Sequence, residues 1–396
     1  MQGHARPWGV LVGNSQLMPE MDVEAARRKR QLLNGPIRAN RLAGLEAARK
    51  AGARNLIWDI SRLALRRPGL TADEYFYYCL YEPLFAPEQR ARFVGKKMQA
   101  AIHNACNDSA WFASVDDKLL FYSIMRGTGV PTAETVAVYT TKDRASFCPI
   151  LRDEQALRGF LTDSSNYPLF LKPVDGMYSI GTFYLHEPSG SDLLLKNGCK
   201  APLDAVVAFV QKYTQAGYLI QSVLQPRQQL AESFGTTLPS IRYLILLTDE
   251  GPQLESAVLK IPCGRNVADN YWRDGNMLGA INLDDGIVRR AVTGTGETLV
   301  EIETHPDTGH KLAGMSLPDW GPATELCLKT ASMFPGIRTQ SWDIALSAQG
   351  PIVLEMNFGG DLNLHQLANG RGILSDTYVR HLRSCGYRGK LPGPTS

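Results

Sequence analysis

The chain has 396 residues, 44% of them apolar and 20% charged, so it can bury a sizeable core. This composition excludes a disordered or fibrous protein, and a formal net charge of +3 at pH 7 does not indicate a nucleic-acid-binding protein. The length fits two or three lobes, or one enzyme of interleaved lobes.

The amino-terminal flank carries a strong charge asymmetry. Residues 1–67 contain 13 Lys and Arg against 5 Asp and Glu, a net charge of +8, whereas the rest of the chain is net −5. Segments 21–33 and 39–52 have apolar residues at helical spacing, so we expect two helices separated by a Gly-Pro turn. The basic run at 27–30 could contact anionic lipid or another polyanion, although such a run is more often a solvated helix face.

Segment 71–85, TADEYFYYCLYEPLF, is dense in Tyr and Phe. At helical spacing these side chains usually fill a core or dock onto another lobe. A platform that stacks bases would need interleaved positive charge, which this segment lacks. We therefore expect a mainly helical region that packs through its aromatic side chains.

The seven cysteines are scattered and include no CxxC or CxxxC pair. We therefore expect neither a disulfide framework nor a zinc site. No apolar run approaches the roughly 18 residues that cross a bilayer, and the first residues lack a basic segment followed by a long apolar one. These features predict a protein of the reducing cytoplasm without a transmembrane segment.

From about residue 130 the pattern changes to short β-type runs, with a helical stretch near 202–213. The runs TVAVY, PLFLKPV, TFYLH and YLIQSVL predict the strands of an α+β lobe. Three further pairs of runs follow, and each pair is joined by a short turn that ends in glycine, at Gly251, Gly286 and Gly350. They predict three hairpins in series and an antiparallel sheet.

A glycine-containing turn follows the predicted strand that ends at Lys172. Gly176, Ser179 and Gly181 lie in this turn. Glycine lets backbone N–H groups approach phosphate oxygens closely, and a lysine at a strand end supplies a point charge. Taken alone, an ordinary hairpin with a surface lysine is the more common meaning of this pattern. The segment contains no Walker A motif, and no GxGxxG motif precedes a helix here.

The last hairpin makes a more specific prediction. If its turn centres on Gln349, then Asp343 and Glu355 lie opposite one another, and alternation places Asn357 on the same face. Two facing carboxylates repel unless a cation lies between them. Mg²⁺, which prefers carboxylate and phosphate oxygens, would fit. The alternative is a solvated sheet face, but the acids stand in apolar strands, which favours a lined cleft.

Arg242 and Lys260 are lone cations in otherwise apolar strands. Each could hold a phosphoryl group or a substrate carboxylate, and each could equally reach solvent with its charged end. The histidines do not cluster, and no GxSxG, HExxH or Cys-His spacing indicates nucleophilic or zinc-dependent hydrolysis.

In chain order, the blocks DDKLLFYSIMRGTGVPTAET, LFLKPVDGMYSIGT, YLIQSVLQ, SIRYLILLT and WDIALSAQGPIVLEMN resemble the ATP-grasp superfamily. The segments EYFYYCLYEPLF, DNYWRDGNMLGAINLDDG and HPDTGHKLAGMSLPDW resemble its sugar-transfer associated branch, which is related to alpha-L-glutamate-ligase-like proteins. The resemblance spans roughly residues 70 to 385. It implies an α+β fold of two lobes that enclose a nucleotide, with a helical region at 1–112, a small lobe at 113–225 and a large lobe at 226–396.

The resemblance also implies roles for individual residues. Lys118 and Lys172 match the two lysines that reach the ATP phosphates, and Gly176 to Gly181 matches the glycine-rich lid. The stretch whose backbone meets adenine corresponds to Gln221, Ser222, Val223 and Leu224. The family often has an acid where Gln221 stands. Asp343, Glu355 and Asn357 match the acid, acid and Asn that hold magnesium.

One residue departs from the pattern of many ATP-grasp ligases. They carry an arginine two residues before the first metal-binding acid, where this chain has Ser341. The arginine steadies the transferred phosphoryl group and the tetrahedral intermediate. We expect Arg242 or Arg338 to take its place.

The resemblance implies an ATP- and Mg²⁺-dependent ligase that joins a carboxylate to an amine through an acylphosphate. By analogy with the branch, the acid would be a sugar acid of a surface polysaccharide precursor. Two alternatives stay open. One is a phosphotransferase of the same fold, and the other is a non-catalytic nucleotide-binding partner of a glycan assembly complex, held there or at the membrane by the basic flank.

Overall fold

The structure, a computed structural model, describes residues 21–65 and 69–394. The prediction that the first residues carry no secretory signal falls outside the described residues. Part of the predicted basic flank also falls outside them.

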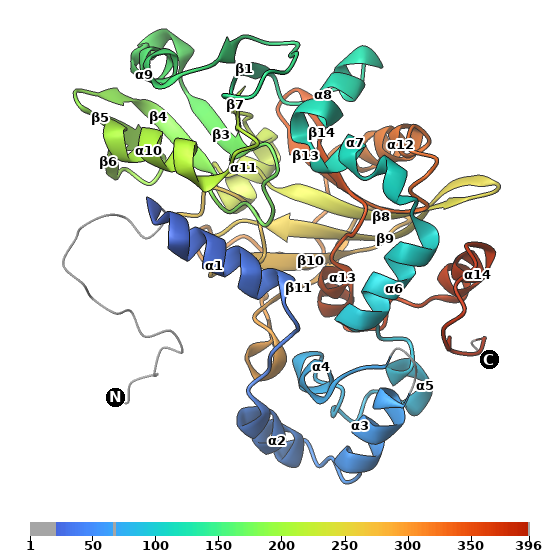
Figure 1. The fold of residues 1–396 in the computed structure, drawn as a ribbon. Helices are drawn as coiled ribbons and strands as arrows, with labels where there is room; N and C mark the ends of the chain where they lie inside the picture. Colours follow the sequence, from blue (N-terminus) through green and yellow to red (C-terminus); the bar gives the residue numbers. More distant parts are fainter. Residues whose placement is uncertain (1–20, 66–68, 395–396) are drawn as a thin grey trace, which may run out of the picture.

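Fourteen α-helices are found in the described part of the chain (Figure 1). Their bounds are α1 Val23–Asn34, α2 Arg41–Lys50, α3 Leu56–Ala64, α4 Ala72–Tyr77, α5 Pro87–Arg90, α6 Lys96–Cys106, α7 Ala113–Asp116, α8 Lys118–Gly127, α9 Glu154–Thr162, α10 Leu203–Tyr213, α11 Gln228–Phe234, α12 Trp320–Ala331, α13 Leu362–Asn369 and α14 Asp376–Ser384. Short 3₁₀ turns occur at Ser109–Trp111, Ser164–Asn166 and Gly296–Thr298.

The first lobe is built on a seven-stranded sheet in the order β2-β1-β7-β3-β4-β5-β6. Its strands are β1 Thr135–Tyr139, β2 Ile150–Leu151, β3 Leu169–Pro173, β4 Phe183–Ser189, β5 Asp192–Leu195, β6 Lys200–Pro202 and β7 Tyr218–Ser222. All four predicted runs form strands of this sheet, and the predicted helical stretch forms α10. Apolar side chains of α9 and α10 pack with the inner residues of this sheet in one core.

The second lobe is built on an antiparallel sheet in the order β12-β11-β10-β9-β8-β13-β14. Its strands are β8 Ser240–Thr248, β9 Gly251–Ile261, β10 Met277–Ile281, β11 Val288–Thr293, β12 Val300–Glu301, β13 Thr339–Ser347 and β14 Gly350–Asn357. The three predicted hairpins are confirmed, because β8 pairs with β9, β10 with β11 and β13 with β14. The predicted α+β class with a helical amino-terminal region is thereby confirmed.

The amino-terminal helices divide between the two lobes. Helix α1 packs against α10 of the first lobe, whereas α2, α3 and α4 pack at the far end of the second lobe (Figure 1). Phe76, Tyr77 and Tyr78 of the aromatic segment are buried there with Leu278 of β10. The aromatic side chains thus anchor α2 to α4 on the second sheet, as the sequence predicts.

None of the described helices combines the length and the hydropathy that crossing a bilayer requires.

Candidate active site between the two sheets

A cavity of about 1440 Å³, counted to its open mouth, lies between the two lobes. Both sheets and the turn after β3 contribute to its wall. Most of the residues singled out from the sequence line it, although they are spread over 240 positions of the chain. They are Lys118, Lys172, Gly176, Ser179, Gln221, Ser222, Val223, Leu224, Arg242, Lys260, Asp343, Glu355 and Asn357.

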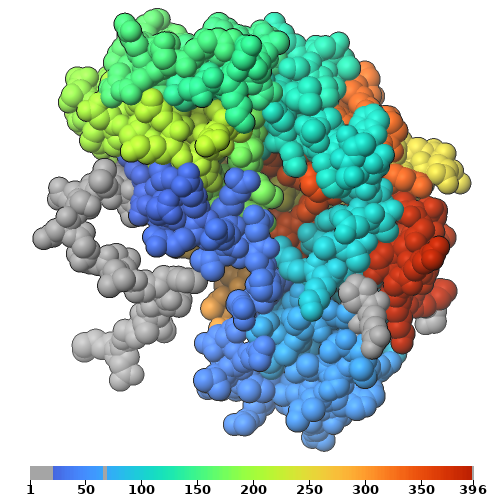
Figure 2. Space-filling model, in the orientation of Figure 1, coloured from blue at the N-terminus to red at the C-terminus, as the bar shows by residue number. Residues whose placement is uncertain are grey.

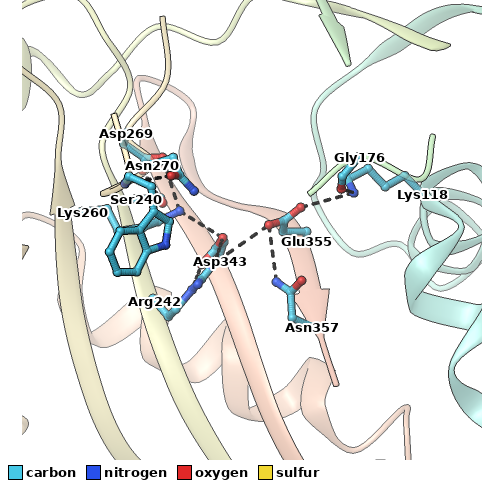
Figure 3. Close-up of polar contacts among 11 residues, drawn as sticks. Lys118, Gly176, Ser240, Arg242, Lys260, Asp269, Asn270, Asp343, Glu355 and Asn357 are labelled. Carbon is cyan, nitrogen blue, oxygen red and sulfur yellow. Dashed lines mark hydrogen bonds and ion pairs between the residues drawn. The ribbon is translucent and has the colours of Figure 1, made fainter. Parts of the chain in front are cut away.

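Two lysines, Lys118 and Lys172, reach the cavity from different elements. Lys118 is the first residue of α8, where the Asp117 side chain caps the helix by accepting a hydrogen bond from the Leu120 amide. Its Nζ donates to the Gly176 carbonyl at 2.5 Å and lies 3.6 Å from Oε2 of Glu355. Burial lowers the pKa of Lys118, and the charge of Glu355 opposes that shift. Lys118 therefore connects the glycine turn with the second lobe (Figure 3).

Lys172 stands near the end of β3 and is buried. Its Nζ donates to the Tyr122 hydroxyl at 2.8 Å and lies 4.8 Å from the centre of the Tyr122 ring. No carboxylate among the described residues forms an ion pair with it. A bound anion could therefore use its charge without displacing an acidic side chain.

The turn after Lys172 has a strained backbone. Tyr178 and Ser179 both adopt positive φ angles, of 57° and 53°, which residues other than glycine rarely adopt. Arg273 of the second lobe donates to the Ser179 carbonyl at 3.0 Å. Gly181 does not line the cavity; its φ of +75° turns the chain back into β4. The turn is thus held over the cavity from both lobes.

The stretch that begins at Gln221 lines the cavity where β7 ends. The Gln221 side chain points into the first lobe and donates to the Thr135 hydroxyl at 3.0 Å. Val223 and Leu224 follow the strand, and their backbone groups form no hydrogen bond within the described chain. A ligand edge could therefore bond this backbone, as the family resemblance implies.

The final hairpin places Asp343 opposite Glu355 as predicted, but its turn and register differ from the prediction. The turn consists of Ala348 and Gln349, because Ser347 pairs with Gly350. A regular hairpin would then set Asp343 opposite Leu354. A bulge at Leu354 shifts the register by one residue, so Asp343 pairs with Glu355.

The groups that neutralise the facing carboxylates differ from the prediction, which placed a metal cation between them. Arg242 lies opposite Asp343 on β8 and donates from Nε and Nη2 at 2.8 and 2.7 Å, and Lys260 of β9 donates at 3.0 Å (Figure 3). Burial alone would raise the pKa of Asp343, but these two cations outweigh it and hold the pKa well below the usual range. The protein itself therefore neutralises Asp343, and the facing acids alone do not require a metal.

Lys260 has a second partner, which the sequence reasoning did not single out. Asp269 lies 3.3 Å from Nζ of Lys260 and accepts from the Ser240 hydroxyl at 2.5 Å. Burial raises the pKa of Asp269, although the charge of Lys260 opposes the shift. Asp269, Asn270 and Trp272 also line the cavity. The sequence did contain a signal for such an acid: Lys260 is a lone lysine in an apolar strand, and a buried cation needs a nearby acid.

Arg338 is a correction. It does not line the cavity; it donates to the Leu247 carbonyl at 3.1 Å and to Asp249 at 2.8 Å, near the turn between β8 and β9. Ser341, at the position of the family arginine, is buried against Gly360, where an added Cβ would lie 1.9 Å from its Oγ. A larger side chain would not fit there. Arg242 is thus the arginine that lies beside the carboxylates.

Magnesium can bind these residues only if some of their oxygens are not already occupied by hydrogen bonds. The Glu355 side chain is 30% exposed, and its nearest cations, Lys118 and Arg242, are 3.6 and 3.9 Å away, beyond hydrogen-bond distance. Asn357 lies beside it, with its amide 3.4 Å from Oε1. The two oxygens of Asp343 already accept three hydrogen bonds of about four that a carboxylate can accept. The set fits a hard cation, with Glu355 and Asn357 more open than Asp343.

Two groups of potential metal ligands lie away from the residues that line the cavity. Cys263, His305 and Asp307 form one. The other is formed by Cys106 of α6, His381 of α14 and Cys385, which follows α14. A structural zinc site needs four ligands. Among the described residues the hydroxyl of Thr339, 3.5 Å from Nε2 of His381, is the only further polar side-chain atom in hydrogen-bond contact with these three. Three ligands do not complete such a site.

Two sheets face one cavity, which lysines and carboxylates line together, and this arrangement is consistent with the ATP-grasp class of protein. Within that class, the model of the sugar-transfer associated ATP-grasp family matches residues 97–380. The chain therefore belongs to this family, and the predicted resemblance is confirmed. No protein with a curated function matches the sequence.

Several solved structures are similar at low identity. The ATP-grasp ligase PsnB in complex with a minimal precursor is 15% identical, with 71% of this chain and 63% of that chain covered and a TM-score of 0.36. An L-amino acid ligase from Bacillus licheniformis is 12% identical, with 70% and 49% covered and a TM-score of 0.36. D-Alanine-D-alanine ligase from Helicobacter pylori is 12% identical, with 69% and 61% covered and a TM-score of 0.40. The chain thus spans less than two thirds of each, and the family assignment rests on the sequence match.

Proposed function

We propose that the protein is an ATP- and Mg²⁺-dependent ligase that joins a carboxylate to an amine through an acylphosphate. The observation that carries the proposal is the cavity itself. Lys172 comes from β3 of the first lobe, Glu355 and Asn357 come from β14 of the second, Lys118 begins helix α8, and all four line the same space. Anionic phosphates between these groups would be bound from both sides.

The residues of this chain would act mainly by position and charge. Lys172 and Lys118 would hold phosphate oxygens, and the glycine turn from Gly176 to Gly181 would cover them and exclude water. Arg242 would face the transferred phosphoryl group with Nη1, because Nε and Nη2 are bound to Asp343. Lys260 would keep the Arg242–Asp343 pair in place. A carboxylate becomes a good electrophile once phosphorylated, and the amine can then attack it.

Glu355 and Asn357, with a remaining lone pair of Asp343, would hold magnesium. When bound, the ion would neutralise charge on the phosphate oxygens.

The acid substrate is proposed to be a sugar acid and the amine an amino acid or simple amine, in the cytoplasm, during synthesis of a surface polysaccharide. This part rests on the family description, which associates the ATP-grasp domain with sugar transfer.

Hydroxylamine tests the reaction because it attacks an acylphosphate and leaves a stable hydroxamate. The full chain is incubated with ATP, Mg²⁺, hydroxylamine and a panel of uronic acids, and ADP and hydroxamate are measured by mass spectrometry. The proposal predicts equal amounts of both with at least one acid. Lys172→Ala should lower turnover at limiting ATP about 10- to 100-fold, the loss of one charge-assisted phosphate contact.

Two results would contradict the proposal. ADP with a phosphorylated sugar hydroxyl, and no hydroxamate, would make the protein a phosphotransferase. A well-folded protein that binds no ATP would make it a non-catalytic partner.

A further inference from the structure

Two residues of the basic run of α1 contact the first lobe. Arg27 donates to the Lys212 carbonyl at 2.6 Å, and Arg30 lies 3.9 Å from Asp175. Met21 and Val23 pack against the first core. These contacts dock α1 onto the first lobe, while Arg28 and Lys29 of the same run are exposed.

Helix α2 buries small residues and exposes large apolar ones, whereas a helix that only packs against its own core does the reverse. Its buried face consists of small residues, Gly44 and Ala48, and a Cβ at Gly44 would lie 2.7 Å from the Phe76 ring. Its larger side chains point to solvent: Leu42 is 81% exposed and Leu45 is 44% exposed. Burying leucines rather than alanines would stabilise the fold more, so the exposed leucines need another explanation.

Helix α3 also exposes large apolar side chains. Leu63 is buried against the aromatic core, whereas Ile57 is 85% exposed, Trp58 is 59% exposed and Leu65, just after the helix, is 79% exposed. Half of the ten large apolar side chains exposed in the described chain lie between residues 42 and 65. Single exposed apolar residues are ordinary, but a concentration of this kind marks an interaction surface.

The charge around these side chains is positive. Arg38, Arg49, Arg54 and Arg62 are exposed, and within the described ranges none of them forms an ion pair with an acid. The guanidinium of Arg62 lies 5.1 Å from the centre of the Trp58 ring. The two acids of the segment are compensated, Glu46 by Lys50 at 3.0 Å and Asp59 by Arg90 at 2.5 Å.

We propose that this α2–α3 surface, formed by Leu42, Leu45, Ile57, Trp58 and Leu65 with Arg38, Arg49, Arg54 and Arg62, binds the surface of an anionic lipid bilayer. Apolar side chains would enter the boundary between headgroups and acyl chains, and the arginines would meet the anionic headgroups. Tryptophan is typical of that boundary. Helices α2 and α3 lie at the lower end of the molecule, away from both sheets, where a flat bilayer can reach them (Figure 1 and Figure 2).

A bilayer explains these features better than a second protein does. A protein partner would need a complementary groove and matching acids for each arginine, whereas a bilayer needs only exposed apolar side chains and cations on a projecting end, which this surface has. Several apolar insertions plus several cations are the two signals that peripheral membrane binding requires. The surface lies far from the cavity, so the proposal stands independently of the reaction.

The test is co-sedimentation of the full chain with vesicles of phosphatidylcholine alone or mixed with phosphatidylglycerol. We expect binding to the anionic vesicles that weakens with added salt. Ile57→Ser/Trp58→Ser should reduce the vesicle-bound fraction at least tenfold, and Leu120→Ser, at an exposed leucine of α8, should leave it unchanged. Arg54→Glu should weaken binding about fivefold or more, and Lys200→Glu should not.

Circular dichroism and ATP binding in solution verify that each variant is folded. No binding to anionic vesicles, equal binding to neutral ones, or equal losses in the control variants would overturn the proposal. It would also be overturned if the wild type is a dimer by light scattering and Ile57→Ser/Trp58→Ser makes it a monomer, because the surface would then belong to a second copy.

Discussion

Asp343 illustrates, at the scale of single residues, how burial changes what a carboxylate does. Three hydrogen bonds from Arg242 and Lys260 hold it ionised in a site that water hardly reaches. Removing the charge of Asp343 would leave the buried cations Arg242 and Lys260 without the carboxylate that they share. We expect Asp343→Asn to lower the free energy of unfolding by about 3 to 5 kcal/mol, the usual effect of breaking a buried ion pair.

Urea unfolding measures this difference, and Glu355→Gln serves as the comparison. Glu355 faces the cavity and forms no close ion pair, so its substitution should change the unfolding free energy by less than about 1 kcal/mol. Equal losses in both variants would show that Asp343 is not the counter-ion described here. For this reason Glu355, rather than Asp343, is the residue to change in a test of metal binding.

Glu255 predicts a pH dependence of stability. Burial raises its pKa to about 7, although Ser375 and Arg371 oppose the shift. The folded protein therefore keeps a proton that the unfolded chain loses near pH 4.3, and this carboxyl lowers stability as pH rises from about 4 to 7. Glu255→Gln should be more stable than wild type by about 1 to 2 kcal/mol at pH 8, and equal to it near pH 4.

Thermal and urea unfolding at both pH values tests this, with the exposed Glu303→Gln as a control that should change nothing at either pH. A stability gain that is the same at pH 4 and pH 8 would show that titration of Glu255 is not its cause.

At the scale of elements, the turn from Gly176 to Gly181 depends on a contact from the other lobe. Arg273 donates to the Ser179 carbonyl and lies 3.3 Å from the Thr182 hydroxyl. We expect Arg273→Ala to free the turn, to weaken ATP binding about tenfold, and to speed hydrogen exchange at residues 177–182. The exposed Arg265→Ala is the matched control. Unchanged exchange in Arg273→Ala would mean that the turn is held by the first lobe alone.

Elements with local signals could be predicted from the sequence. Short turns marked by glycine predict the three hairpins, and alternation in WDIAL and PIVLEM predicts the facing acids. The bulge at Leu354 has no such signal, because it depends on how β14 meets β13 and not on a particular residue type. The same holds for the partners of Asp343: Arg242 and Lys260 come from β8 and β9, about a hundred residues away, and only the sheet order brings them together.

At the scale of the whole molecule, the site is assembled from elements that lie far apart in the chain. Cations that can meet phosphate come from α8 and β3, and the open oxygens come from β14. The distribution of the amino-terminal helices could not be predicted, because helical periodicity identifies a buried face but not the lobe that buries it. A ligand that contacts both lobes should stabilise the folded chain as a unit.

The central claim is that the cavity binds ATP together with a divalent cation, and calorimetric titration of a non-hydrolysable ATP analogue tests it most directly. Wild type, Glu355→Gln and the control Glu303→Gln are titrated with and without MgCl₂. We predict that Mg²⁺ strengthens binding at least tenfold in the wild type and the control. In Glu355→Gln binding without Mg²⁺ should persist and the magnesium effect should disappear. A magnesium effect of equal size in Glu355→Gln, or no nucleotide binding by the folded wild type, would contradict the account.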